Sequence, residues 1–124
     1  MTMKQREGAS NLDPIEASKN LRHFLNRLNT LAFGNAFRRY GKRVEVVAVQ
    51  EVSIGGRLHY HLAMKNPFET LEECEAAICR CWAKTRWGYD EVDVRPIFSS
   101  GWISYITKER RIDGWDVENT HLVR

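Results

Sequence analysis

Two histidines separated by one residue are the first side chains with the spacing of a chemical site. His59 and His61 fall in residues 57–64, whose composition and preceding glycines predict a strand. Because alternate side chains of a strand project from the same face, both imidazoles would point toward one place and could bind a divalent cation. With four histidines in the chain, such a pair arises by chance about one time in ten. A metal site therefore needs a third ligand.

The third ligand would come from the preceding predicted strand, residues 44–52, and its identity depends on the length of the chain reversal. A three-residue reversal centred on Gly55 places Glu51 opposite His59, whereas a two- or four-residue reversal brings Gln50 there. We favour Glu51, because a carboxylate suits a hard divalent cation better than an amide does. Two histidines and a carboxylate would hold Mg²⁺ or Mn²⁺ and leave coordination positions open for substrate oxygens.

A tyrosine and a lysine further along the chain form a second pair. Tyr105 and Lys108 are three residues apart in a short helix that we expect after Ser99 and Ser100. This spacing puts the phenol and the ammonium on one side of the helix. Alone, the pair is more typical of an exposed helix end, but together with the His-x-His strand it indicates reactive groups that face one site.

These motifs resemble those of the HUH endonucleases, specifically the single-tyrosine Rep-type initiators of rolling-circle replication in plasmids and phages. Residues 56–62 resemble the HUH metal motif, and residues 105–108 resemble the Tyr-x-x-Lys motif of the Rep branch. Glu51 stands eight residues before the first histidine, which is a spacing found in that family and supports Glu51 over Gln50. The resemblance covers residues 44–108, and the tyrosine follows the histidines as it does in Rep-like proteins.

The resemblance implies a site-specific single-stranded-DNA endonuclease and strand transferase that nicks a replication origin and initiates rolling-circle replication. A divalent ion (Mg or Mn) held by His59, His61 and Glu51 would polarise the scissile phosphate. Tyr105 would attack it and leave a 5′-phosphotyrosine, while Lys108 would favour the phenolate of a residue whose ordinary pKa is about 10. The implied DNA partner is a single strand or a DNA hairpin at an origin. A host helicase and polymerase are also implied, because the chain has no Gly-x-x-x-x-Gly-Lys-Ser/Thr phosphate loop.

Two alternative functions belong to different classes. A single-stranded-DNA transposase of the same superfamily also places its tyrosine after the histidines; the lysine at the third position favours Rep, and an obligate dimer would favour the transposase. A DNA-binding module that has lost cleavage is disfavoured by intact Tyr105, His59 and His61. Cupin-type sites and metallo-β-lactamase-like hydrolases require acidic residues after the histidines that this chain lacks.

The basic residues gather in one stretch of the chain. No acidic residue occurs between Glu16 and Glu45, although the net charge of +3 is too mild to establish a polyanionic partner by itself. A solvated helix face explains such a stretch about as well as DNA binding does. Given the resemblance, we expect five residues to hold the DNA backbone electrostatically: Arg38, Arg39, Lys42, Arg43 and Arg57.

Size and composition fit one globular domain. The chain has 124 residues, of which 43% are hydrophobic and 28% are charged. No stretch approaches the roughly twenty apolar residues that span a bilayer. The cysteines, an odd number clustered between Cys74 and Cys81, make a poor disulfide framework and suit a reducing compartment. We therefore expect a single domain over residues 1–124, located in the cytoplasm, with no membrane partner.

The remaining patterns predict an α+β fold in which α-helices flank a central antiparallel β-sheet. Capping residues predict helices that begin at Pro14 and after Thr70. Residues 44–64 would form a hairpin, and residues 92–98 would add a strand at an edge. Compared with the HUH family, the first strand is missing or reduced to residues 1–5. The tryptophans are more typical of a core than of a surface that stacks on bases.

Overall fold

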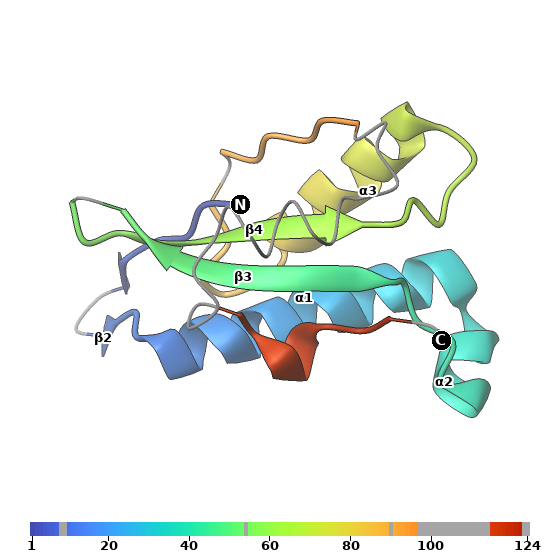
Figure 1. The fold of residues 1–124 in the computed structure, drawn as a ribbon, viewed down its shortest axis with the longest axis horizontal. Coiled ribbons are helices and arrows are strands. Elements are labelled where there is room, and N and C mark those ends of the chain that lie inside the picture. The colour runs from blue at the N-terminus through green and yellow to red at the C-terminus, as the bar shows by residue number, and fades with distance from the viewer. Residues whose placement is uncertain (8–9, 54, 90, 97–114, 123–124) are drawn as a thin grey trace.

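The computed structural model of the protein describes residues 1–7, 10–53, 55–89, 91–96 and 115–122. The predicted α+β class is confirmed, because β3 and β4 form an antiparallel pair against which helices pack (Figure 1). The elements in chain order are β1 (Arg6–Glu7), β2 (Ser10–Asn11), α1 (Pro14–Phe33), α2 (Asn35–Tyr40), β3 (Val46–Val52), β4 (Leu58–Met64), α3 (Leu71–Ala83) and the 3-10 helix η2 (Val117–Asn119).

Side-chain caps fix the predicted helix starts. The Asp13 carboxylate accepts a hydrogen bond from the backbone N–H of Glu16 at 2.8 Å, and Pro14 occupies the first helical position of α1. The Thr70 hydroxyl accepts one from the backbone N–H of Glu73 at 3.1 Å at the start of α3. Both predicted starts are therefore confirmed, and the interruption expected after α1 occurs at Gly34, which has a φ of 55°.

The two faces of the β3–β4 pair have different environments. Alternate residues such as Ala48 and Tyr60 face α1 and α3 and belong to the main core. That core includes the buried Trp82 and Trp87, and Phe24 meets the Trp82 ring edge-on at 5.5 Å between centroids. The assignment of these two tryptophans to the core is thus confirmed. The opposite face carries a smaller apolar cluster, which consists of Val47, Val49, Ala63 and the half-buried Trp115.

The cysteines of α3 follow the same division between inside and outside. Cys74 and Cys81 are buried against the core, and burial raises the pKa of both thiols. Cys79 lies between them on the exposed side of the helix. All three are free thiols, so the expectation that they form no disulfide framework is confirmed.

The N-terminal segment covers the free edge of β4. The backbone N–H of Tyr60 donates to the Met1 carbonyl at 3.0 Å, and Thr2 forms an antiparallel bridge with His59. The Gln5 side chain continues this pairing, since it both accepts from and donates to the backbone of Leu58 at 2.8 and 3.0 Å. The reduced first strand expected over residues 1–5 is therefore present as isolated bridging contacts.

The C-terminal segment covers the free edge of β3. Val46 and His121 exchange two backbone hydrogen bonds of 2.8 Å, and the N–H of Asp116 donates to the Ala48 carbonyl at 2.8 Å. Val49 also bridges to Trp115. Because both edges are paired, the hairpin is held rigidly between the two ends of the described chain.

The predicted third strand is wrong for residues 92–96, which form no strand. The alternation that predicted it has another cause, because Val92 and Val94 pack against the main core. Residues 1–4 occupy the position beside β4 that this strand would have taken. Residues 97–98 of that prediction, and the short helix expected after Ser100, lie outside the described residues. Within the described part of the chain, the helices are too short or too polar to cross a membrane.

Candidate metal centre

The register of the hairpin determines which residue joins the histidines. Glu51 pairs with His59, and Val49 pairs with His61. The turn is closed by the Ser53 N–H, which donates to the Arg57 carbonyl at 2.9 Å, and by Gly56, which adopts a left-handed φ of 79°. This is the reversal centred on Gly55, so Glu51 lies opposite His59 as predicted and the alternative register with Gln50 is wrong.

The three predicted ligands converge. The Nε2 atoms of His59 and His61 are 3.1 Å apart, and the carboxylate oxygens of Glu51 lie 3.6 and 3.5 Å from them. One ligand atom from each residue can be chosen so that all lie within 4.8 Å of one another. Adjacent ligands of an octahedral ion with bonds of about 2.1 Å are about 3.0 Å apart. The observed separations therefore need only small side-chain shifts to enclose a divalent ion.

The backbone around His59 orients its ring for this role. Nδ1 of His59 lies 3.4 Å from the Arg57 carbonyl, which can only accept a hydrogen bond. The proton of the neutral imidazole is therefore placed on Nδ1, and the lone pair of Nε2 is directed to the cluster. The donor set of two imidazole nitrogens and one carboxylate thus fits a divalent cation.

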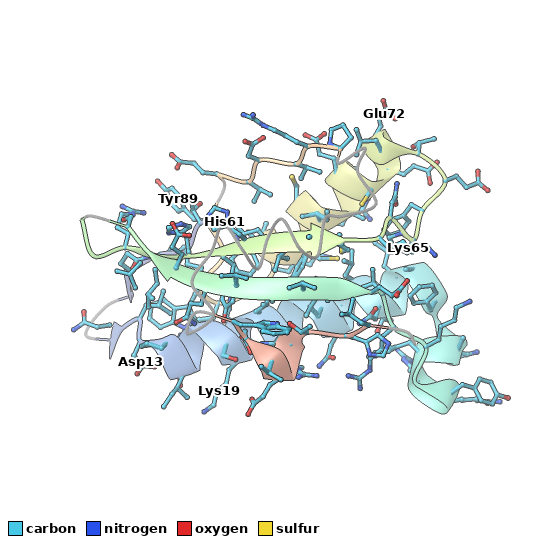
Figure 2. The ribbon with its side chains drawn as sticks, viewed as in Figure 1. Asp13, Lys19, His61, Lys65, Glu72 and Tyr89 are labelled. Atoms are coloured by element: carbon cyan, nitrogen blue, oxygen red, sulfur yellow. The ribbon has the colours of Figure 1, made fainter. Side chains whose placement is uncertain are left out.

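The cluster is accessible from solvent. The side chains of His59, His61 and Glu51 are 21, 34 and 36% exposed, so a substrate oxygen could reach an ion held between them. His61 lies nearer the hairpin turn than Lys65, which follows the last residue of β4 (Figure 2). An open site with few protein ligands is typical of catalytic ions and differs from closed structural sites.

The residue between the two histidines faces the other way and is fully buried. The Tyr60 hydroxyl donates to Asp116 at 2.7 Å and accepts from the Gln50 amide at 3.0 Å. Ser18 and Asn119 each donate a further hydrogen bond of 2.8 Å to the same carboxylate oxygen of Asp116. Burial and the carboxylate of Asp116 raise the pKa of Tyr60, so its phenol stays protonated.

The Tyr60 network was not predicted, because Asp116 lies in a C-terminal stretch without periodicity. It connects β4 to β3 through Gln50, to α1 through Ser18 and to the C-terminal segment through Asp116. The strand that carries both histidines is consequently fixed from its buried face. Gln50, the alternative ligand, belongs to this network.

The other predicted site residues are distributed differently. Arg57 is exposed in the hairpin turn, two residues from His59. The other four basic residues, Arg38, Arg39, Lys42 and Arg43, lie on α2 or just after it, at the end of β3 opposite the turn (Figure 1). Tyr105 and Lys108 lie outside the described residues.

One comparison with known proteins gave a match. Residues 1–110 match a family model described as replication-associated protein ORF2. Comparisons with curated proteins and with solved structures gave no match. The matched range includes the cluster of Glu51, His59 and His61 as well as the positions of Tyr105 and Lys108.

Proposed function

The chain belongs to the family of replication-associated protein ORF2, and we propose that it is a metal-dependent, site-specific endonuclease and strand transferase that nicks single-stranded DNA at a replication origin. The observation that carries this proposal is the convergence of Glu51, His59 and His61 near the turn of the hairpin. Family membership supports a role in replication; the ligand cluster supports phosphate chemistry. The proposed unit is a single HUH-type domain over residues 1–124.

His59, His61 and Glu51 would hold Mg²⁺ or Mn²⁺ in this function. The bound ion would supply Lewis-acid polarisation of the scissile phosphate and offset its negative charge. The protein contributes the orientation, because the Arg57 carbonyl keeps the His59 proton on Nδ1 and the Tyr60 network holds the strand in place. Arg57 itself is exposed beside the site and would contact a neighbouring phosphate.

Tyr105 and Lys108 are proposed as the nucleophile and its cationic partner on the strength of the Tyr-x-x-Lys motif. The phenolic oxygen of Tyr105 would attack the phosphorus while the bond to the 3′ oxygen breaks, giving a 5′-phosphotyrosine and a free 3′-hydroxyl. Lys108 would stabilise negative charge on the phenolate. Because the phosphodiester is exchanged rather than hydrolysed, the 3′-hydroxyl could later reverse the step and rejoin the strand. A host helicase and polymerase would complete rolling-circle replication.

Covalent trapping tests this function. The protein is incubated with a single-stranded DNA library and Mn²⁺, and trapped strands are sequenced to find the cleavable site. Tyr105→Phe should remain folded and bind DNA, but it should form no adduct on a denaturing gel because the attacking oxygen is gone. Lys108→Ala should slow adduct formation by about 10²- to 10³-fold, as loss of one charge-stabilising donor does.

Tyr89→Phe is the matched control, since Tyr89 is partly exposed and lacks a lysine at the third position. It should form the adduct at the wild-type rate. An undiminished adduct in Tyr105→Phe would refute the assignment of the nucleophile and, with it, the Rep-like mechanism.

A further inference from the structure

An aromatic ring projects into solvent at the end of α2. Tyr40 is 81% exposed, and none of the residues of α2 is buried. The helix stops immediately after it, where Gly41 adopts a left-handed φ of 68°. A single exposed aromatic side chain is common on proteins. Its neighbours make this one informative.

Cations surround the Tyr40 ring along the chain. Arg38, Arg39, Lys42 and Arg43 are exposed, and within the described residues they make no ion pair with a carboxylate. Lys42 lies over the ring of Phe33 at 5.1 Å and Arg43 over that of Phe37 at 5.7 Å. These cation–π contacts position two of the cations without neutralising them. We call Arg38, Arg39, Tyr40, Lys42 and Arg43 the α2 tip.

The positive surface continues onto α1. Arg27 of α1 and Arg38 of α2 line a shallow hollow of about 400 Å³, together with Asn26, Thr30 and Leu31. Leu31 is about half exposed. The hollow therefore offers charged and polar groups beside an apolar surface, as a strand of alternating phosphates and bases would require.

We propose that the α2 tip is a second DNA contact, in which Tyr40 stacks on an unpaired base and the surrounding cations hold the flanking phosphates. This inference rests on the proposed function, because it assigns the contact to the strand whose scissile phosphate lies at the metal centre. An exposed ring favours a single strand over a duplex, since bases in a duplex are already stacked on one another. Every base presents a π-face, so the contact tolerates different sequences.

The position of the α2 tip sets the length of DNA involved. Val46 begins β3 and Glu51 lies five residues later, which corresponds to about 17 Å along the strand. The α2 tip lies beyond Val46, at the end opposite the turn (Figure 1). A stacked strand advances about 3.4 Å per nucleotide, so the two contacts are separated by about five nucleotides or more.

Affinity measurements with a 20-nucleotide oligo-dT strand and a 20-base-pair duplex test this contact. Tyr40→Ala should weaken binding of the single strand about five- to a hundred-fold, which is the range for loss of one aromatic stack. Tyr40→Phe should bind within about twofold of wild type, because it keeps the ring. Tyr40→Leu keeps apolar bulk without a π-face and should resemble Tyr40→Ala. The effect on the duplex should be less than twofold for all three.

Salt dependence separates stacking from charge. Tyr40→Ala should leave the slope of log affinity against log salt unchanged, whereas Arg39→Ala should reduce it by about 0.7. Ile15→Ala is the control for an exposed apolar side chain, because Ile15 is 68% exposed in the first turn of α1, beside Glu16. It should leave binding unchanged, and thermal unfolding should show that every variant is folded.

Three results would overturn the proposal: unchanged single-strand affinity in Tyr40→Ala, an equal loss on the duplex, or a similar loss in Tyr40→Phe. In each case, continued covalent trapping through Tyr105 would leave the proposed nicking function standing. A wild-type protein that neither binds single-stranded DNA nor forms an adduct would overturn both proposals together.

Discussion

The two faces of β4 are built in opposite ways, although their residues alternate along one strand. On the open face, His59 and His61 are partly exposed, and their Nε2 atoms stand 3.5 to 3.6 Å from the Glu51 carboxylate. On the buried face, Tyr60 is inaccessible to solvent and its hydroxyl makes hydrogen bonds of 2.7 and 3.0 Å. The open face leaves lone pairs available for a cation, whereas the buried face satisfies its polar atoms within the protein.

This contrast shows how a small hairpin can carry a precise site. The ligands themselves are held loosely, so their positions depend on the strand beneath them. The Tyr60 network holds that strand from segments that are distant in sequence, since Ser18 and Asp116 are 98 residues apart. Binding chemistry and structural anchoring are therefore assigned to neighbouring residues. The two tasks should respond to mutation separately.

The largest expected effect is loss of the proposed ion from the open face. His59→Ala or His61→Ala should lower Mn²⁺ affinity by at least about 100-fold, measured by titration calorimetry, because each removes one of three ligands. DNA cleavage should disappear with it, and EDTA should have the same effect on wild type until Mg²⁺ or Mn²⁺ is restored. The free energy of unfolding without metal should change by only about 0.5 kcal/mol, because both side chains are partly exposed. Full cleavage in EDTA would contradict the metal assignment.

A second prediction compares neighbours on β3 that face opposite sides. Glu51→Ala should reduce Mn²⁺ affinity about 10- to 100-fold, because it removes the only carboxylate of the cluster among the described residues. Gln50→Ala should leave Mn²⁺ affinity nearly unchanged, because Gln50 contacts Tyr60 and the Pro14 carbonyl. The same calorimetric titration ranks the two variants. The reverse ranking would show that the hairpin adopts the other register in solution.

Local chemistry explains what could be predicted from the sequence. Asp13 and Thr70 cap helices through side chains that act within three residues. The glycines at positions 55 and 56 fixed the hairpin reversal, and with it the pairing of Glu51 with His59. These features depend on short stretches of chain, so the sequence alone was sufficient for them.

The features that could not be predicted depend on contacts between distant residues. The alternation of Val92 and Val94 is the same whether they form a strand or pack on the core as irregular chain. The edge of β4 is paired by residues 1–4 instead, and nothing in their composition specifies that partner. Asp116 has no periodicity around it, and its partner Tyr60 lies 56 residues away. Long-range pairing therefore decided each of these outcomes.

The smallest expected effect concerns the buried face. Tyr60→Phe keeps the ring in the core and removes the hydroxyl, while Asp116 retains its hydrogen bonds from Ser18 and Asn119. Gln50 also retains the Pro14 carbonyl at 3.1 Å. The free energy of unfolding should therefore fall by only about 1 kcal/mol, measured by urea denaturation near neutral pH. Mn²⁺ affinity should change only a few-fold, because the ligands remain and only the support of their strand is weakened.

The pH dependence of that difference tests the network directly. Folding raises the pKa of Tyr60 above its ordinary value of about 10, through burial and the Asp116 carboxylate. Above about pH 10 the unfolded chain releases the phenolic proton while the folded protein still holds it, so the folded state binds more protons and its stability falls as pH rises. Tyr60→Phe has no such proton to release. Its stability should therefore approach or exceed that of wild type above about pH 10, and a constant difference between the two proteins from pH 7 to 11 would mean that Tyr60 is not buried beside Asp116 in solution.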